Sequence, residues 1–181
     1  MIAEAIKKYA LLFEGIKERG NNQGWEDVFF PSLNMSFQEL METVGWKETH
    51  AWCSYFSELV WKLAYSEFDG TIVDKLDKLF SANAVNTWNN FNSSDFICSK
   101  VPIKGSVVIW QMYKDGKKTT SGHAGIVIGV VDGVIKTIEG NTNKKGSREG
   151  DQVAHKIKII NFDKKDNGLV LLGFVHPKKT T

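Results

Sequence analysis

The hydrophobic pattern of this chain changes its period near residue 100, and that change limits the possible folds more than any other feature. In the first half, apolar residues recur at the three- and four-residue spacing of amphipathic helices, most clearly over residues 2–16 and 52–68. In the second half, short β-branched runs bounded by glycines indicate strands. These runs cover residues 106–112, 123–131, 134–139, 153–160 and 169–175.

Helices followed by strands predict an α+β fold, in which N-terminal helices pack on a C-terminal antiparallel sheet of about five strands. With 181 residues, the chain has the length of one ordinary domain. We therefore expect a single domain over residues 1–181, mainly helical over 1–100 and mainly β over 101–177, with no second domain beside it.

Local signals mark the ends of several elements in the helical half. Ser36 and Glu39 have the spacing of a capping box, which predicts the start of a short helix that ends at Gly45. Residues 74–88 are predicted to be helical in parts.

In the β half, Asp132-Gly133 between two apolar runs predicts a two-residue hairpin turn. Pairing 131 with 134 would place His123 opposite position 142. The long loop over residues 140–151 is a candidate functional segment, because long loops in compact domains often carry function.

Composition excludes several classes of function. The net charge of +2 is too small to indicate a nucleic-acid partner. No apolar run approaches the roughly 18 residues of a membrane span, so we expect no membrane insertion. Residues 1–20 carry spaced charges and lack the apolar core of a secretory signal, which predicts synthesis as a soluble cytoplasmic protein. Two cysteines are too few for a disulfide framework or a structural zinc site, and we predict no metal and no cofactor.

Cys53 lies between aromatic residues at the predicted start of the helix over residues 52–68. The free N–H groups and the positive dipole end of a helix N-terminus favour a thiolate and can hold a developing oxyanion. A buried structural cysteine is the alternative interpretation, because free cysteine is among the most buried residue types. A Cys53–Cys98 disulfide is a further alternative in an oxidising compartment.

His123 opens the strand predicted over residues 123–131, and small residues share its face. A partly buried histidine with a backbone partner is the alternative. On the following strand, Glu139 and Asn141 are two residues apart and therefore point the same way. An acid or amide beside a histidine fixes its tautomer and stabilises the imidazolium. Together with Cys53, these residues predict a site for acyl transfer. The remaining histidines, at positions 50, 155 and 176, fit this arrangement less well.

Four separated motifs carry a resemblance to a known family. In chain order they are AWCSYF around Cys53, P-x-x-G-S-V-V-I-W at residues 102–110, SGHAGIVIG around His123 and TIEGNTN around Glu139. This order resembles the CHAP (cysteine, histidine-dependent amidohydrolase/peptidase) family, which is related to NlpC/P60 proteins within the papain-like superfamily. The resemblance extends from about residue 21 to residue 175.

The resemblance implies a papain-like fold with Cys53 as nucleophile, His123 as general base, Glu139 as its orienting acid and Asn141 as a supporting polar residue. It implies a peptidoglycan hydrolase, either an N-acetylmuramoyl-L-alanine amidase or an endopeptidase of the peptide stem or cross-bridge. Phage lysins (endolysins) and bacterial wall-remodelling enzymes are of this kind. Two alternatives remain open: a cysteine hydrolase of another amide, and a non-catalytic wall-binding or phage structural module.

Such an enzyme would act on the cell wall after release or export, on a peptidoglycan or peptide substrate, with an export, holin or targeting partner. No separate wall-binding domain is visible, so substrate affinity would come from the catalytic groove or from a partner protein. We expect Trp52, Trp88 or Trp110 to line that groove, with core packing as the alternative.

Overall fold

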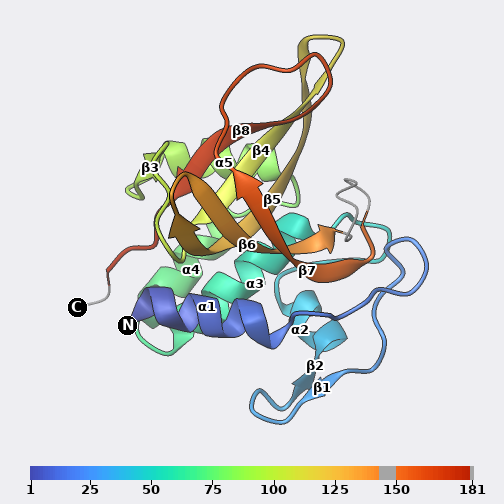
Figure 1. Cartoon of the computed structure of the whole chain (residues 1–181). Helices are drawn as coiled ribbons and strands as arrows, with labels where there is room; N and C mark the ends of the chain where they lie inside the picture. The colour runs from blue at the N-terminus through green and yellow to red at the C-terminus, as the bar shows by residue number, and fades with distance from the viewer. Residues whose placement is uncertain (143–149, 180–181) are drawn as a thin grey trace.

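The computed structural model describes residues 1–142 and 150–179 of the chain (Figure 1). The helices within these residues are α1 (Ile2–Leu12), α2 (Phe37–Thr43), α3 (Cys53–Ser66), α4 (Gly70–Leu79) and α5 (Ala84–Asn92). The strands are β1 (Phe29–Phe30), β2 (Met35–Ser36), β3 (Cys98–Ser99), β4 (Val107–Lys114), β5 (Lys117–Val131), β6 (Val134–Thr142), β7 (Gln152–Ile159) and β8 (Gly168–Val175).

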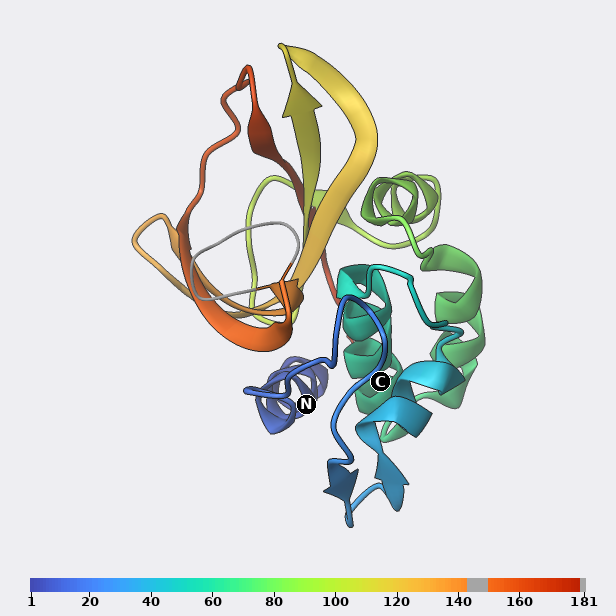
Figure 2. The same cartoon turned by 90° about the vertical axis from the view of Figure 1, so that its right-hand side faces the viewer.

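The strands of the second half form one antiparallel sheet in the order β3-β8-β4-β5-β6-β7, and β1 and β2 form a separate ribbon. The predicted α+β class is therefore confirmed. All five predicted strands are present, and the sheet gains one more, β3, whose two residues are too few to produce a periodic pattern. The sheet is strongly curved (Figure 2).

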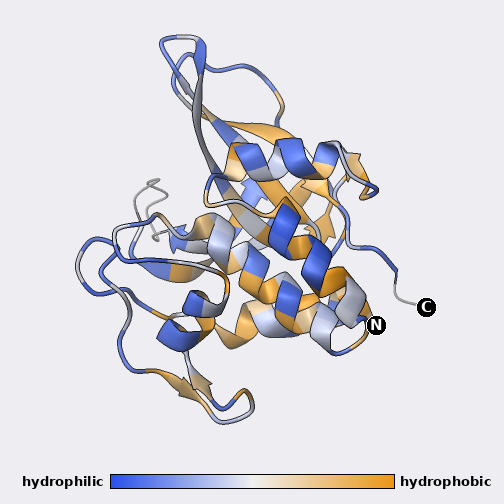
Figure 3. Ribbon diagram, turned by 180° about the vertical axis from the view of Figure 1, so that it is seen from behind, coloured by the Kyte–Doolittle hydropathy of each residue, from blue (hydrophilic) through white to orange (hydrophobic). Residues whose placement is uncertain are grey.

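Most of the core lies between the helices and one face of this sheet. Helix α3 is central, because it contacts α1, α4, β5 and β6. Its side chains Phe56, Trp61 and Tyr65 have no exposed surface. Figure 3 shows hydrophilic residues on the outer sides of the helices and hydrophobic residues between helices and sheet. In the described part of the chain, no helix combines the length and apolar character needed to cross a membrane.

The opposite face of the sheet carries a smaller apolar cluster. Its buried members are Val108, Trp110, Val127, Ile135, Leu171 and Phe174. These residues come from strands, and Ile160 and Phe162 of the segment between β7 and β8 pack against them.

The structure confirms the predicted capping box and end of α2, and residues 74–88 are helical in parts, as predicted. Ser36 and Glu39 form the expected capping box at the start of α2, and Gly45 follows its end in a left-handed conformation. The region 74–88 is divided between α4 and α5. The break falls at Phe80–Asn83, where Asn83 caps α5 by accepting from the N–H groups of Val85 and Asn86.

The hairpin between β5 and β6 has the predicted turn but a different register beyond it. Val131 pairs with Val134 and Gly129 with Lys136, as expected. A bulge between Val127 and Gly129 then shifts the pairing by one residue, so that Ile126 faces Ile138. The predicted position of His123 opposite residue 142 is therefore wrong, because a bulge adds one unpaired residue to its strand.

The segment after α1 continues the sheet at its β7 edge. The N–H of Gly15 donates to the carbonyl of Val153 at 2.9 Å, and the N–H of Val153 donates to Ile16 at 2.8 Å. The N–H of Glu18 donates to Asp151 at 2.7 Å. These bonds fix the segment beside the start of β7, so that Glu18 lies near the end of α3 that carries Cys53.

Candidate active site

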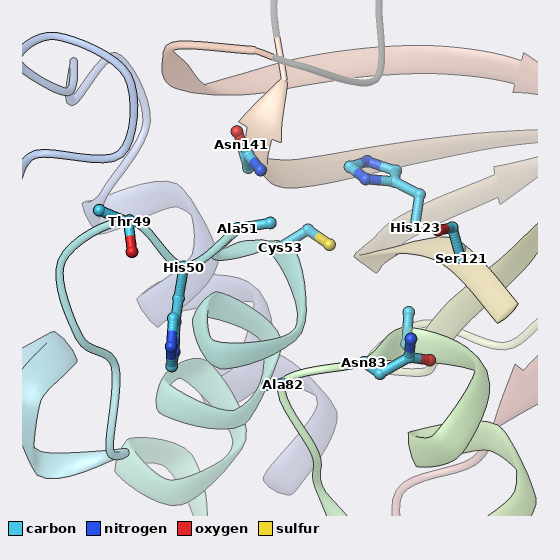
Figure 4. Close-up of a pocket in the computed structure, with 11 residues that line it drawn as sticks. Thr49, His50, Ala51, Cys53, Ala82, Asn83, Ser121, His123 and Asn141 are labelled. Atoms are coloured by element: carbon cyan, nitrogen blue, oxygen red, sulfur yellow. The ribbon is translucent and has the colours of Figure 1, made fainter.

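Cys53 is the first residue of α3, as the sequence predicts. Its N-cap residue, Trp52, provides no side-chain cap, so the first N–H groups of the helix remain available to another acceptor. Cys53 is 6% exposed, and Figure 4 shows its sulfur directed towards the part of β5 that carries Ser121 and His123. Both Cys53 and Cys98 are free thiols, so the alternative of a disulfide between them does not hold.

His123 lies on β5 and faces the same pocket as Cys53. Its Nε2 is 2.9 Å from Oε2 of Glu139. Its ring stacks on Trp110, its cross-strand neighbour, at 5.8 Å between centroids and an interplanar angle of 30°. Because Nε2–H donates to a carboxylate, Nδ1 is the nitrogen left to exchange a proton with Cys53.

Glu139 is completely buried and is held by several donors. The hydroxyl of Thr137 donates to its Oε1 at 2.6 Å, and Nζ of Lys158 lies 3.1 Å from its Oε2. Burial opposes the charge on Glu139, but His123, Lys158 and Thr137 outweigh burial and lower the pKa to about 2. The side chain is therefore a carboxylate at neutral pH and accepts from both neighbours.

Cys53 and His123 shift each other's titration in opposite directions. Burial disfavours a thiolate, but the imidazole and the N–H groups of Ala124 and Ser54 favour it more, so that the pKa of Cys53 is lowered. Burial likewise disfavours the imidazolium, but Cys53 and Glu139 raise the pKa of His123 to about 9. Between these two pKa values the site favours a thiolate–imidazolium pair.

Two glycines allow these side chains to meet, and the sequence pattern did not identify their purpose. A Cβ on Gly125 would lie 2.6 Å from Cγ of Glu139. The side chain of Glu139 therefore occupies the space that a side chain at position 125 would fill, and in this way it reaches His123. A Cβ on Gly140 would lie 2.7 Å from both Phe56 and Trp52. Gly140 therefore lets the first turn of α3 lie directly on β6.

Asn141 lines the same pocket, but the regular strand alternation that was expected to carry on from Glu139 is interrupted at this residue. It adopts a left-handed conformation with φ of 50°, at a shift in the β6–β7 register between Glu139 and Thr142. Asn141 is 3% exposed, and within the part of the chain that the structure describes its buried Oδ1 has no hydrogen-bond partner. That oxygen is an acceptor beside the pocket.

The pocket has a volume of about 400 Å³, which suits one or two residues of a peptide. Figure 4 shows it open between two walls. Thr49, His50 and Ala51 form one wall, and Ala82, Asn83 and Ala84 with Ser121 and Gly122 form the other. The sequence interpretation set His50 aside, and the structure places it here, with Nδ1 3.2 Å from the hydroxyl of Tyr55.

None of the three tryptophans lines this pocket, and their role in a groove stays a prediction. Trp52 has no exposed surface, and its Nε1 donates to Oε2 of Glu18 at 2.5 Å. Trp110 is 6% exposed and packs on His123. Trp88 packs partly buried against the core. For the predicted loop over residues 140–151, positions 143–149 lie outside the described residues.

An α+β fold with a cysteine at a helix start, a strand histidine and a buried acid is typical of papain-like thiol hydrolases. Comparison with known families gives a more specific result. The family model of the CHAP domain matches residues 45–141, which is more than half of the chain. The chain therefore belongs to the CHAP family, whose members are in general cysteine- and histidine-dependent amidases or peptidases of peptidoglycan. No curated protein and no solved structure matches the chain.

Proposed function

We propose that this protein is a peptidoglycan hydrolase that cleaves an amide bond, as an N-acetylmuramoyl-L-alanine amidase or as an endopeptidase of the stem or cross-bridge. In this proposal Cys53 is the nucleophile, His123 the general base and acid, and Glu139 the residue that orients it. Asn141 is a supporting polar residue. The observation that carries the proposal is the 2.9 Å contact of His123 Nε2 with Glu139, which leaves Nδ1 for Cys53 in a shared pocket.

The chemistry follows from this arrangement. His123 takes the proton of the Cys53 thiol, and the thiolate attacks the carbonyl carbon of the bound amide. The N–H groups at the start of α3 stabilise the oxyanion. The imidazolium gives its proton to the leaving amine as the C–N bond breaks, and a thioester remains. Water, deprotonated by His123, then attacks the thioester, which releases a carboxylate and restores the thiol.

We also propose that the described residues work as one catalytic unit. Residues outside 45–141 support the site directly: Lys158 contacts Glu139, and Glu18 contacts Trp52 beside the nucleophile. The small, open pocket provides little contact area, so strong attachment to the wall would come from a partner protein.

The test is to incubate the purified protein with peptidoglycan and to identify new amino groups by mass spectrometry. A new N-terminal L-alanine would indicate an amidase, and a new amine within the stem or cross-bridge an endopeptidase. Cys53→Ala and His123→Ala should each abolish release. Cys98→Ala is the matched control and should retain it, because burial raises the pKa of Cys98 to about 11 and it lies outside the pocket.

Two results would contradict the proposal. Wild-type protein that releases no fragment from peptidoglycan but hydrolyses other peptide amides would favour the other cysteine-hydrolase alternative. Wild-type protein that binds peptidoglycan without any new amine, and whose Cys53 alkylates no faster than Cys98 at pH 7, would favour the non-catalytic binding module.

A further inference from the structure

Trp110 connects the proposed catalytic residues with strand β7, on the face of the sheet away from the helices. Its ring stacks on His123, and Nζ of Lys158 lies 4.1 Å from the ring centroid. Lys158 belongs to β7 and lies outside the segment that the CHAP family model matches. The ammonium group of Lys158 therefore lies over Trp110, beside the site.

The ammonium group of Lys158 contacts the oxygen of Glu139 that also binds His123. Nζ of Lys158 is 3.1 Å from Oε2 of Glu139, and Nε2 of His123 is 2.9 Å from the same atom. The side chain of Lys158 is 29% exposed and that of Glu139 only 1%. The ammonium group of a lysine thus lies against the carboxylate that contacts His123.

This sharing of one oxygen has a definite electrostatic consequence. The attraction of Glu139 for a charged His123 is reduced by the positive charge already bound to it, and the two cations also repel each other. Both effects make the imidazolium a stronger acid. An imidazolium that is held too tightly would be slow to give its proton to a leaving amine.

We propose that Lys158 is a positioning residue of this site, which fixes the carboxylate of Glu139 and limits how strongly that carboxylate holds the charged His123. The inference rests on the proposed roles of Cys53, His123 and Glu139. Within the described residues, Thr137 from β6, Cys53 from α3 and Lys156 from β7 also face Glu139 or His123. Of the two lysines, Lys158 is the one that the structure shows in contact with the carboxylate.

The test follows the rate of Cys53 alkylation across pH in a Cys98→Ala background, so that a single thiol reports. Lys158→Met removes the charge and keeps an unbranched chain over Trp110. Lys158→Arg keeps the charge. Lys136→Met is the matched control, because Lys136 is an exposed lysine of β6 on the opposite face of the sheet. The titration of His123 is measured in parallel by NMR of its ring carbons.

We expect Lys158→Met to raise the pKa of His123 and to move the alkaline limb of the alkylation profile from about 9 to higher pH, by about half a unit or more. Lys158→Arg and Lys136→Met should each leave the alkaline limb of the alkylation profile at its wild-type pH. A variant that merely loosens the fold would lower the rate at every pH without moving the limb. If Lys158→Met does not fold, Lys158→Gln makes the same charge change.

An unchanged His123 titration in Lys158→Met, or a limb that Arg fails to restore, would overturn the inference. Neither readout needs a substrate. Wild-type protein that does not cleave peptidoglycan would therefore count against the proposed function, while the effect of Lys158 on His123 would still be measured.

Discussion

At the scale of single residues, the site depends on a glycine as much as on the side chains that carry the chemistry. Gly125 lies between His123 and Val127 on β5, and Glu139 crosses the space above it. The sequence shows small residues on the same face as His123, and these leave room beside its ring. The structure gives that room to the orienting acid.

Gly125→Ala tests this assignment. The added methyl group would lie 2.6 Å from Cγ of Glu139, so the carboxylate must move away from His123. We expect kcat to fall by roughly 10- to 1000-fold, because an unsupported imidazole loses its tautomer and orientation. Gly129→Ala in the same strand is the control, since its nearest contact would be 3.9 Å away. Equal activity of the two variants in the amine-release assay would disprove the role of Gly125.

A second buried acid, Glu58 on α3, has no part in the proposed chemistry. Burial raises its pKa to about 8, Lys62 opposes that rise, and Asp77 adds to it. A carboxyl whose pKa is higher in the folded state favours folding below its unfolded pKa of 4.5, and this contribution is lost as the pH rises through about 8.

Glu58→Gln should therefore stabilise the protein in alkaline solution. Each unit of pKa difference corresponds to about 1.4 kcal/mol, and we expect a gain of about 2–4 kcal/mol at pH 9 that disappears near pH 4. Calorimetric melting at several pH values measures this difference. The exposed Glu26, changed to Gln, is the control and should give no such trend. A gain that is the same at pH 4 and pH 9 would refute the explanation.

At the scale of elements, the site is assembled where the start of α3 rests on β6. Gly140 allows the close approach of Trp52 and Phe56, and the carboxylate of Glu18 holds the indole of Trp52. Glu18 is itself fixed by its N–H bond to Asp151 at the start of β7. The segment after α1 thus ties the nucleophile helix to the edge of the sheet.

Glu18→Ala should loosen this junction. It leaves the buried N–H of Trp52 without a partner, at a cost of about 1–3 kcal/mol, and allows Cys53 to move relative to His123. We expect a lower melting temperature and slower alkylation of Cys53 at pH 7. Glu18→Gln keeps an acceptor oxygen and should recover most of both quantities. If Gln behaves like Ala, the contact with Trp52 does not set the position of Cys53.

The sequence patterns predicted elements better than their junctions. The capping box at Ser36 and the turn at Asp132-Gly133 were predictable because each depends on adjacent residues. The bulge near Gly129 was not, because one extra residue in a strand leaves the apolar alternation almost unchanged. It moved the register at His123 by one position.

The contacts of the site show the same limit. Thr137 could have been identified, since it lies two residues before Glu139 and so shares its face. Lys158 and Glu18 could not have been identified. They are brought to the site by the order of the strands and the path of the chain, which no local sequence pattern specifies. For Trp52 the sequence left a groove role and core packing open. The structure shows core packing, because the first turn of α3 lies directly on Gly140 of β6.

At the scale of the whole molecule, the residues that match the CHAP family model do not contain a complete sheet. Residues 45–141 include β4, β5 and nearly all of β6, but not β7 or β8. In the full chain β4 pairs with β8 along its length, and α1 packs against α3. In the matched segment alone, β4 therefore lacks its neighbour β8, and β6 lacks its neighbour β7.

We expect a fragment of residues 45–141 not to fold cooperatively. Removing β8 and α1 exposes the apolar faces of β4 and α3, and the buried area that remains is too small to offset the conformational entropy. Near-ultraviolet circular dichroism and thermal melting of the fragment measure this. The full chain should melt in one transition, and a fragment that melts with the same sharpness would show that the family segment is a domain by itself.

The position of β8 also affects how the chain can fold as it is made. β8 follows the other strands of the described sheet in the chain, yet it lies between β3 and β4. Until it emerges, β3 has no neighbour and one edge of β4 is open, although both have already been synthesised. The sheet therefore stays incomplete, with one edge of β4 unpaired, until β8 has been synthesised. During that interval a chaperone that covers exposed strands would protect the nascent chain from pairing with another chain.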